Sequence, residues 1–348
     1  MRTEPSVIER MPRAAAAPDA PARRGARERV VVALARPGVR LALLAALAAA
    51  SVAVFVFVGI EGSWAFAVPF RLRKVAAMLL VAVAIGVSTV LFQTITGNRI
   101  LSPAIMGFDA LYVLIQTVVV FAFGAGALAT TDPNLMWLVE VGAMVVFSGL
   151  LFRWVFARSA RSVHLLVLVG IVFGVLFRSV SSLMQRMLDP AAFAVLQDSF
   201  FASFTGVDET LLGISTVAVV AVTAIAVPLV RRLDVLLLGE SHAIGLGVDH
   251  RRTVTLVLVL VAVLVSVSTA LVGPVAFFGL LVANLAYLVV GSFRHAATLP
   301  AAVLLGVICL VGGQFLLEQL GLGTALSVVI EFVGGIVFIL MLVRKGVR

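Results

Sequence analysis

Residues 273–291 read GPVAFFGLLVANLAYLVVG, and their pattern points to the architecture of the chain. This stretch follows an unbroken apolar run over about 252–272, and the Gly273-Pro274 pair separates the two. Because roughly 20 apolar helical residues cross a bilayer core, two apolar runs joined by a tight turn indicate two consecutive membrane helices. The second helix is short and carries one amide side chain, Asn284, among aliphatic residues. We expect Gly273-Pro274 to form a sharp turn and Asn284 to be a polar link between helices.

The composition of the whole chain indicates the same class of protein. Of 348 residues, 62% are hydrophobic and 12% are charged, whereas soluble domains carry about 25% charged residues. The net charge of +9 comes from basic residues that lie between the apolar runs. That distribution is typical of the cytoplasmic face of a membrane protein and not of a nucleic-acid groove. The sequence therefore predicts an integral membrane protein with no nucleic-acid partner.

The residue pattern gives no support for catalysis or metal binding. The single cysteine, Cys309, lies in an apolar run without a partner, so we expect no disulfide framework. The four histidines have no metal-ligand spacing: His164, His242, His250 and His295. Neither Lys74 nor Lys345 follows glycine in the Gly-Lys-Ser/Thr context of a nucleotide-binding loop. We expect no metal, no bound cofactor and no enzyme activity in this chain, so any ATP is bound by another chain.

Ten apolar stretches are candidates for membrane helices, at about 39–60, 74–95, 103–124, 136–156, 163–183, 210–230, 252–272, 276–291, 298–316 and 325–343. Lysine and arginine gather in alternate segments between them, which places both termini in the cytoplasm by the positive-inside rule. Residues 1–38 are rich in Ala, Pro and Arg, and we interpret them as a disordered basic cytoplasmic arm. Residues 39–348 then form an all-α, multi-pass transmembrane domain in the cell membrane.

Two segments between these stretches are more patterned than simple connections need to be. RRLDVLLLGESHAIGLGVDHRR, residues 231–252, has glycines that divide it into two short helices with apolar faces. Such faces are too short to span, so the segment lies at the membrane surface or packs against a partner protein. In residues 184–209, Pro190 suits the first turn of a helix, and Phe193, Leu196, Phe200 and Phe204 recur at helical spacing. This half-helix covers a cavity or lies against lipid headgroups.

Four motifs, in order along residues 40–345, resemble those of the FecCD-type permeases. LLLGESHAIGLGV resembles the family's coupling pattern of Leu-Gly, three residues, Ala, two residues and Leu-Gly-Val. GPVAFFGLL resembles the run that starts the family's eighth span. RLRK at 71–74 resembles the family's box after the first span, and TGNRILSPAIMG at 96–107 resembles its element between the second and third spans. These permeases are membrane subunits of bacterial importers for iron–siderophore chelates, haem and vitamin B12. The resemblance implies a BtuC-like fold, the permease fold of type II ABC importers, with about ten transmembrane helices.

The chain departs from the family pattern at several of these motifs. Arg73 stands where the family has proline in the first box, and Arg99 follows Asn98 where proline is usual. Ala283-Asn284 replaces a Pro-His pair. This variant is similar to the second permease of systems that import catecholate-type ferric siderophores such as petrobactin. The resemblance therefore implies a ferric siderophore as cargo, a second and non-identical permease chain, cytosolic ATP-binding subunits and an extracytoplasmic substrate-binding lipoprotein.

The resemblance also assigns roles to individual residues. The residues that it implies contact the ATP-binding subunit are Leu238, Gly239, Glu240, Ala243, Leu246 and Gly247. It implies that Arg71 and Lys74 bind the lipoprotein. The alternative is that these two side chains extend toward lipid headgroups. The residues that it implies line the translocation pathway are Arg178, Ser179, Ser181, Ser182 and Gln185. Close helix packing is expected from Gly170 and Gly174 at the subunit interface, and from Gly273, Pro274 and Gly279.

Polar residues inside apolar stretches leave two other functions open. Asp109, Gln116 and Glu331 lie in or near spans, where ionisable groups are usually functional or paired, and Asp109 is placed to pair with Arg99. In an ion-coupled secondary transporter, Asp109 and Glu331 would carry protons and no ATPase would be needed. A membrane anchor or assembly factor would carry no cargo, so it would not need a polar-lined fifth span.

Overall fold

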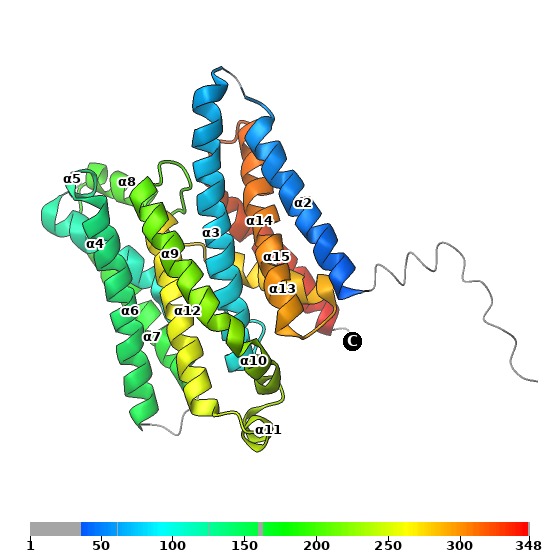
Figure 1. Cartoon of the computed structure of the whole chain (residues 1–348). Helices are drawn as coiled ribbons and strands as arrows, with labels where there is room; N and C mark the ends of the chain where they lie inside the picture. The colour runs from blue at the N-terminus through cyan, green and yellow to red at the C-terminus, as the bar shows by residue number, and fades with distance from the viewer. Residues whose placement is uncertain (1–35, 61, 125, 159–162, 347–348) are drawn as a thin grey trace, which may run out of the picture.

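The structure, a computed structural model, describes residues 36–60, 62–124, 126–158 and 163–346. Most of the expected N-terminal arm, residues 1–35, lies outside the described residues, and positions 37 and 38 already belong to the first helix. Proline at position 37 suits the first turn of a helix because its missing N–H is not needed there. The described part of the chain is helical and contains no strand (Figure 1).

The helices follow one another without any intervening domain. In order they are α2 (Pro37–Phe57), α3 (Trp64–Thr96), η1 (Pro103–Met106), α4 (Phe108–Phe123), α5 (Ala127–Thr130), α6 (Pro133–Arg158), α7 (Val163–Gln185), α8 (Pro190–Asp198), α9 (Glu209–Ala226), η2 (Val227–Leu229), α10 (Val230–Leu236), α11 (Glu240–Gly245), α12 (His250–Val272), α13 (Phe278–Val290), α14 (His295–Gln319) and α15 (Leu326–Gly346).

The predicted membrane helices all have counterparts in this bundle. Seven described helices are long and apolar enough to cross a membrane, and α4, α13 and α15 are shorter apolar helices. Each predicted stretch overlaps one of these ten. The largest difference is α3, which begins at Trp64 and continues through Pro69, so the RLRK box lies inside a helix and not in a loop after the first span. Membrane helices tolerate such a proline because neighbouring groups satisfy the freed carbonyl.

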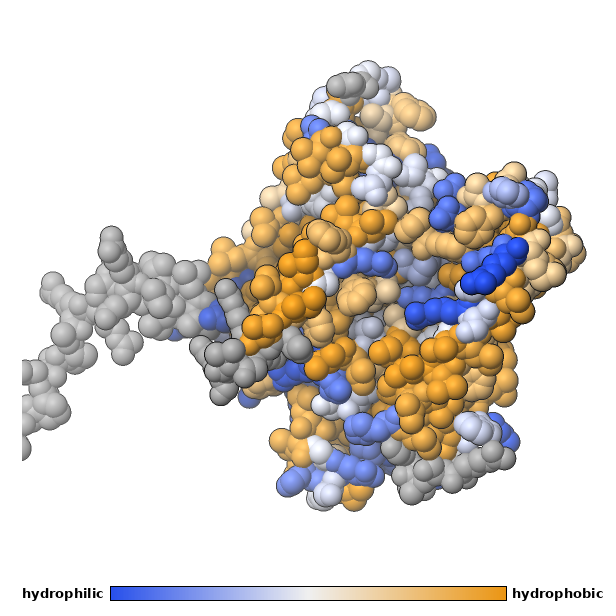
Figure 2. All heavy atoms as spheres, turned by 180° about the vertical axis from the view of Figure 1, so that it is seen from behind, coloured by the Kyte–Doolittle hydropathy of each residue, from blue (hydrophilic) through white to orange (hydrophobic). Residues whose placement is uncertain are grey.

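Helix α3 forms the centre of the bundle. Every residue from 84 to 96 is buried, and α3 packs against α2, α9, α12, α13 and α14 (Figure 1). Two apolar clusters meet at this helix, one shared with α12, α6 and α7 and the other with α14, α13 and α2. The outer helices instead carry large exposed apolar residues, and hydrophobic residues cover much of the surface seen in Figure 2.

The bundle has two distinct ends. Helices α10 and α11 lie at one end, which we call the elbow end, whereas α5 and α8 lie at the opposite end (Figure 1). The beginning of α2 is also at the elbow end, where Arg40 Nη1 donates to the carbonyls of Val289 and Val290. The predicted half-helix α8 begins at Pro190, with Asp189 accepting from the first-turn amides. It ends at Asp198, and Leu196 is its fully buried anchor.

Glycines bring α7 and α13 close to other elements. A methyl group at Gly170 would meet Met106 of η1 at 3.0 Å, and one at Gly174 would meet the adjoining Gly107 at 3.2 Å. The expectation that these two glycines lie at a subunit interface is therefore wrong, since both are packed inside their own chain. Gly273 adopts φ 96° and approaches the backbone of residues 201 and 202, which confirms the sharp turn before α13.

We expect Gly279→Ala to lower the melting temperature of the purified protein. The new methyl group would meet Thr89 Oγ1 and Ile85 Cγ2 of α3, and overpacking a core costs about 1–3 kcal/mol. Gly312→Ala is the matched control, because a methyl group there meets nothing within 4 Å and alanine favours a helix. Thermal unfolding in detergent should give a lower Tm for the first variant and an unchanged or higher Tm for the second. Equal Tm values would contradict the close packing of α3 on α13.

Candidate functional site

The segment from 230 to 249, which we call the elbow, contains α10, α11 and their connections. Helix α10 packs on α3 and α14, and α11 packs on α12 (Figure 1). Gly239 separates the two helices with φ 94°, and Gly247 turns the chain toward α12 with φ 81°. Both values lie in the left-handed region, where residues with a Cβ are strained. The two short helices predicted from the glycine pattern are confirmed, although Gly245 ends α11 and does not divide the segment further.

The elbow has a buried face and an exposed face. Leu233, Leu236 and Ala243 are buried against the bundle. The exposed face carries four large apolar side chains, which we call the elbow ridge, with exposures of 41 to 63%: Leu237, Leu238, Ile244 and Leu246. Gly239, Glu240 and Gly247 are exposed as well, so five of the six proposed ATPase contacts lie on the surface. The exception is Ala243, which is fully buried and so anchors the elbow instead of contacting a partner.

A chain of polar side chains joins the elbow to two helices of the bundle. Asp234 Oδ1 in α10 accepts a hydrogen bond from the backbone N–H of His295 at 2.9 Å and lies 2.6 Å from His295 Nδ1. The other ring nitrogen, Nε2, is 2.7 Å from Thr94 Oγ1 in α3. His295 is 2% exposed and is the first residue of α14. These contacts, which we call the elbow link, connect α10, α14 and α3, with His295 and Thr94 buried and the Asp234 side chain 34% exposed.

Sequence reasoning missed the elbow link. Its members are separated by 61 and 201 residues along the chain. An isolated histidine at the edge of an apolar run has no local signal that identifies its partners. Only the packing of α10 between α3 and α14 brings the three side chains together.

The loop that precedes η1 is held by contacts to α3 and α13. The carbonyl of Arg99 accepts from Gln93 Nε2 at 2.8 Å and from Asn284 Nδ2 at 3.1 Å. The guanidinium of Arg99 lies over the rings of Tyr287 and Phe293, 4.4 and 4.7 Å from their centroids. Asn284 is thus a polar link, although it joins α13 to this loop and not to another helix as the sequence indicated. The expected Asp109–Arg99 pair is wrong, because Arg99 is held by aromatic rings instead.

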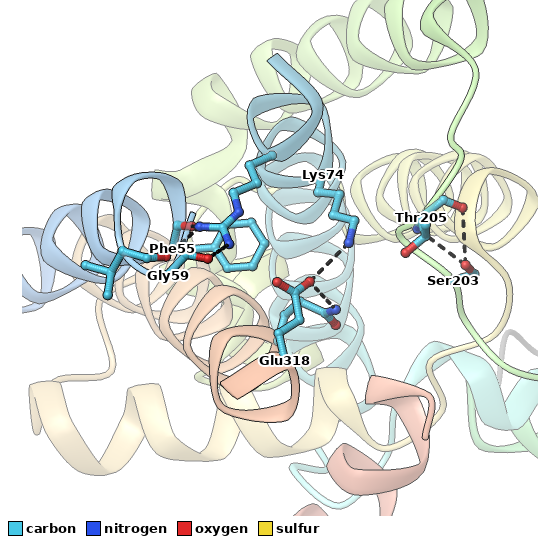
Figure 3. Close-up of polar contacts among 9 residues, drawn as sticks. Phe55, Gly59, Lys74, Ser203, Thr205 and Glu318 are labelled. Carbon is cyan, nitrogen blue, oxygen red and sulfur yellow. Dashed lines mark hydrogen bonds and ion pairs between the residues drawn. The ribbon is translucent and has the colours of Figure 1, made fainter. Parts of the chain in front are cut away.

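At the opposite end, Arg71 and Lys74 both have partners within the chain, and Figure 3 shows Lys74 pointing toward Glu318. Arg71 donates to three carbonyls at the end of α2: Phe55, Val58 and Gly59. Lys74 Nζ is 3.0 Å from Glu318 Oε1 of α14, and its side chain is only 12% exposed. Both residues therefore have a structural role, and lipoprotein docking stays a prediction for them. Arg73, 52% exposed, pairs with Glu209 at 2.8 Å.

The predicted pathway residues on α7 divide between two faces. Arg178, Ser179 and Ser182 are exposed, on a helix that also exposes large apolar residues: Leu168, Val172, Val175 and Leu176. Ser181 is buried, and Gln185 Nε2 donates to Thr117 Oγ1 of α4 at 3.1 Å. The structure therefore brings three of the five together on one exposed surface and places the other two against the bundle.

A buried carboxyl group in α6 is a second feature that sequence reasoning missed. Glu140 is 2% exposed, and its Oε1 accepts from Gln116 Nε2 of α4 at 2.6 Å. Gln116 is thus paired, as polar residues inside spans usually are. The available signal was one carboxylate within the apolar stretch 136–156. Glu331, in contrast, lies on the exposed surface of α15.

Comparisons with known proteins place this geometry in a family context. Residues 39–344 match the model of the FecCD transport family. The petrobactin import system permease protein YclO of Bacillus subtilis (strain 168) is 42% identical over 312 residues, which cover 89% of this chain and 99% of that protein. FatC of Bacillus anthracis, also a petrobactin import system permease protein, is 35% identical over 276 residues, covering 79% of this chain and 78% of that one. A solved structure of an inward-facing metal-chelate type ABC transporter shares the fold with TM-score 0.76 and 22% identity, covering 88% and 99% of the two chains.

We expect Asp234→Ala to destabilise the protein more than Asp234→Asn does. The alanine variant leaves the buried N–H groups of His295 without an acceptor, which costs about 1–3 kcal/mol, whereas asparagine retains a side-chain oxygen. Thermal unfolding of the purified chain measures the difference. Equal destabilisation by alanine and asparagine would show that the hydrogen bonds from His295 contribute nothing to the effect.

Proposed function

The chain belongs to the FecCD transport family, and we propose that it is the membrane-spanning permease subunit of an ATP-driven importer for a ferric siderophore. The single observation that carries the proposal is the 42% identity to a petrobactin permease over nearly the whole of both chains. The cargo is then a catecholate-type chelate of the petrobactin kind. The elbow end faces the cytoplasm, in agreement with the placement of basic residues.

The elbow is the element that receives force from a separate ATP-binding subunit. Its ridge presents exposed leucine and isoleucine side chains on a short, hydrogen-bonded element, which suits insertion into an apolar groove of a partner. A conformational change driven by a partner requires contacts that differ between two states. The elbow link then carries a displacement of α10 to the first residue of α14 and to α3, because Asp234 is bonded to both the backbone and the ring of His295.

The exposed face of α7 is the proposed wall of the pathway. Arg178, Ser179 and Ser182 offer one positive charge and two hydroxyl groups, which suit an anionic ferric catecholate. The large apolar residues on the same helix are then covered by a second, non-identical permease chain that completes the channel. The lipoprotein docks at the opposite end, where Arg73 is a more accessible cation than Lys74.

Leu238→Glu should abolish copurification of the ATP-binding subunit while leaving the membrane domain folded. Leu238 is 57% exposed on the elbow ridge, and a charge in the centre of an apolar contact removes at least about 1.4 kcal/mol, or tenfold in affinity. Leu320→Glu is the control, because this leucine is 68% exposed at the opposite end of α14. Copurification that is unaffected by Leu238→Glu, or equally reduced by both variants, would contradict the assigned coupling role.

Uptake of labelled ferric petrobactin tests the proposed cargo and energy source together. In a strain that lacks its own permeases, expression of this chain with its neighbouring ATP-binding, permease and lipoprotein subunits should restore uptake. A ferric hydroxamate serves as the control cargo and should be taken up poorly. Uptake that persists after removal of the ATP-binding subunit would instead support the ion-coupled transporter.

A further inference from the structure

A groove of about 820 Å³ runs between α6 and α12 at the elbow end of the bundle. Its walls include Gly149 and Arg153 of α6 together with Arg251, Arg252, Leu256 and Val259 of α12. The two helices pack against each other, and the lower end of α12 lies beside α11 (Figure 1). The groove is separate from the elbow ridge and from the exposed face of α7, so neither proposed role of those surfaces uses it.

The charged end of the groove is strongly basic. Arg153, Arg251 and Arg252 are all exposed there. Arg252 Nε is 3.1 Å from Asp249 Oδ2, and no carboxylate among the described residues pairs with the other two arginines. Three guanidinium charges against one carboxylate leave an excess of two positive charges. This end therefore favours an anion, and guanidinium groups bind phosphate with paired hydrogen bonds.

The rest of the groove is apolar and leads toward the middle of the bilayer. Leu256 and Val259 are 38% and 43% exposed, and Val259 lies about 10 Å along the helix axis from Arg252 at 1.5 Å per residue. A second groove of about 600 Å³ lies on the other side of α6, where Phe173 of α7 forms part of its wall, and it shares Arg153. Its walls are apolar and include Trp154, a residue type that is common at membrane interfaces.

We propose that these two grooves form a binding site for an anionic phospholipid. The phosphate-bearing headgroup lies among Arg153, Arg251 and Arg252, and the acyl chains follow the apolar walls on both sides of α6. A soluble anion would use the arginines but not the walls, and a zwitterionic lipid would use the walls but leave the excess charge unbalanced. Basic pockets between membrane helices are known to bind anionic headgroups. This proposal does not depend on the cargo or on the ATP-binding subunit.

Glycine positions on α6 allow the groove to be filled without disturbing the core. A Cβ at Gly149 meets nothing within 4 Å, so Gly149→Trp should fold normally while its indole occupies the groove. Gly142→Trp is the matched control, since a Cβ at this position of the same helix also meets nothing within 4 Å but the position does not line the groove. Melting temperatures of both variants should equal that of the parent chain, which separates loss of lipid from loss of fold.

The experiment measures phosphatidylglycerol and phosphatidylcholine bound to the full purified chain, by native mass spectrometry after reconstitution with defined mixtures of the two. We expect preferential retention of phosphatidylglycerol, its loss in Gly149→Trp and its preservation in Gly142→Trp. Arg153→Gln/Arg251→Gln should weaken binding about 25-fold, since each arginine near an anionic headgroup contributes about fivefold. The charge-matched control is Arg231→Gln/Arg294→Gln, outside the groove, which should retain the lipid.

Three results would overturn the proposal. Equal retention of the two lipids would remove the anionic preference, and an equal loss in groove and control variants would remove the site. Displacement of phosphatidylglycerol by inorganic phosphate alone would show that the arginines bind a soluble anion and that the apolar walls contribute nothing. None of these results would alter the proposed transport role, because the measurement uses neither siderophore nor ATP-binding subunit.

Discussion

The enclosure of α3 by the other helices is the constraint on which the rest of the structure depends. A membrane core has no water to satisfy a displaced backbone, so the surrounding helices can only slide or tilt as intact units. Close contacts fix their distances from α3: Gly86 lies against the backbone of Ala302, and Gly279 against Thr89. Because α14 and α13 are held this closely, a displacement at one end of α3 or α14 is transmitted along the helix and not absorbed locally.

The elbow matters because it reaches this enclosed core from the surface. Its buried face is anchored by Leu233 and Ala243, and Asp234 continues into the bundle through His295. Its exposed face carries the apolar side chains of the elbow ridge, which are 41 to 63% exposed. A short element with one anchored and one exposed face suits the transfer of movement between chains. A flexible loop with the same residues would change its own backbone conformation and would not transmit the movement to the bundle.

The sequence was sufficient for features that depend on local pattern. Apolar length predicted ten membrane helices, and glycine spacing predicted the two helices of the elbow. Contacts between distant residues were beyond this reasoning, because Lys74 and Glu318 are separated by 244 positions and meet only where α3 crosses α14. The same limit explains the errors at Gly170 and Gly174, whose spacing indicates close packing but not which element packs there. The burial of Ala243 also depends on how α11 sits on α12, which a motif does not reveal.

Site-directed cross-linking tests the central claim most directly, that movement enters the bundle at the elbow. A cysteine replaces Ile244, which is 58% exposed on the ridge, in a chain with Cys309→Ser, and is combined with the ATP-binding subunit. The account predicts a cross-link whose yield changes between nucleotide-free and ATP-bound states, and none from a cysteine at Leu320. A cross-link from position 320, or none from position 244 in either state of an active transporter, would contradict it.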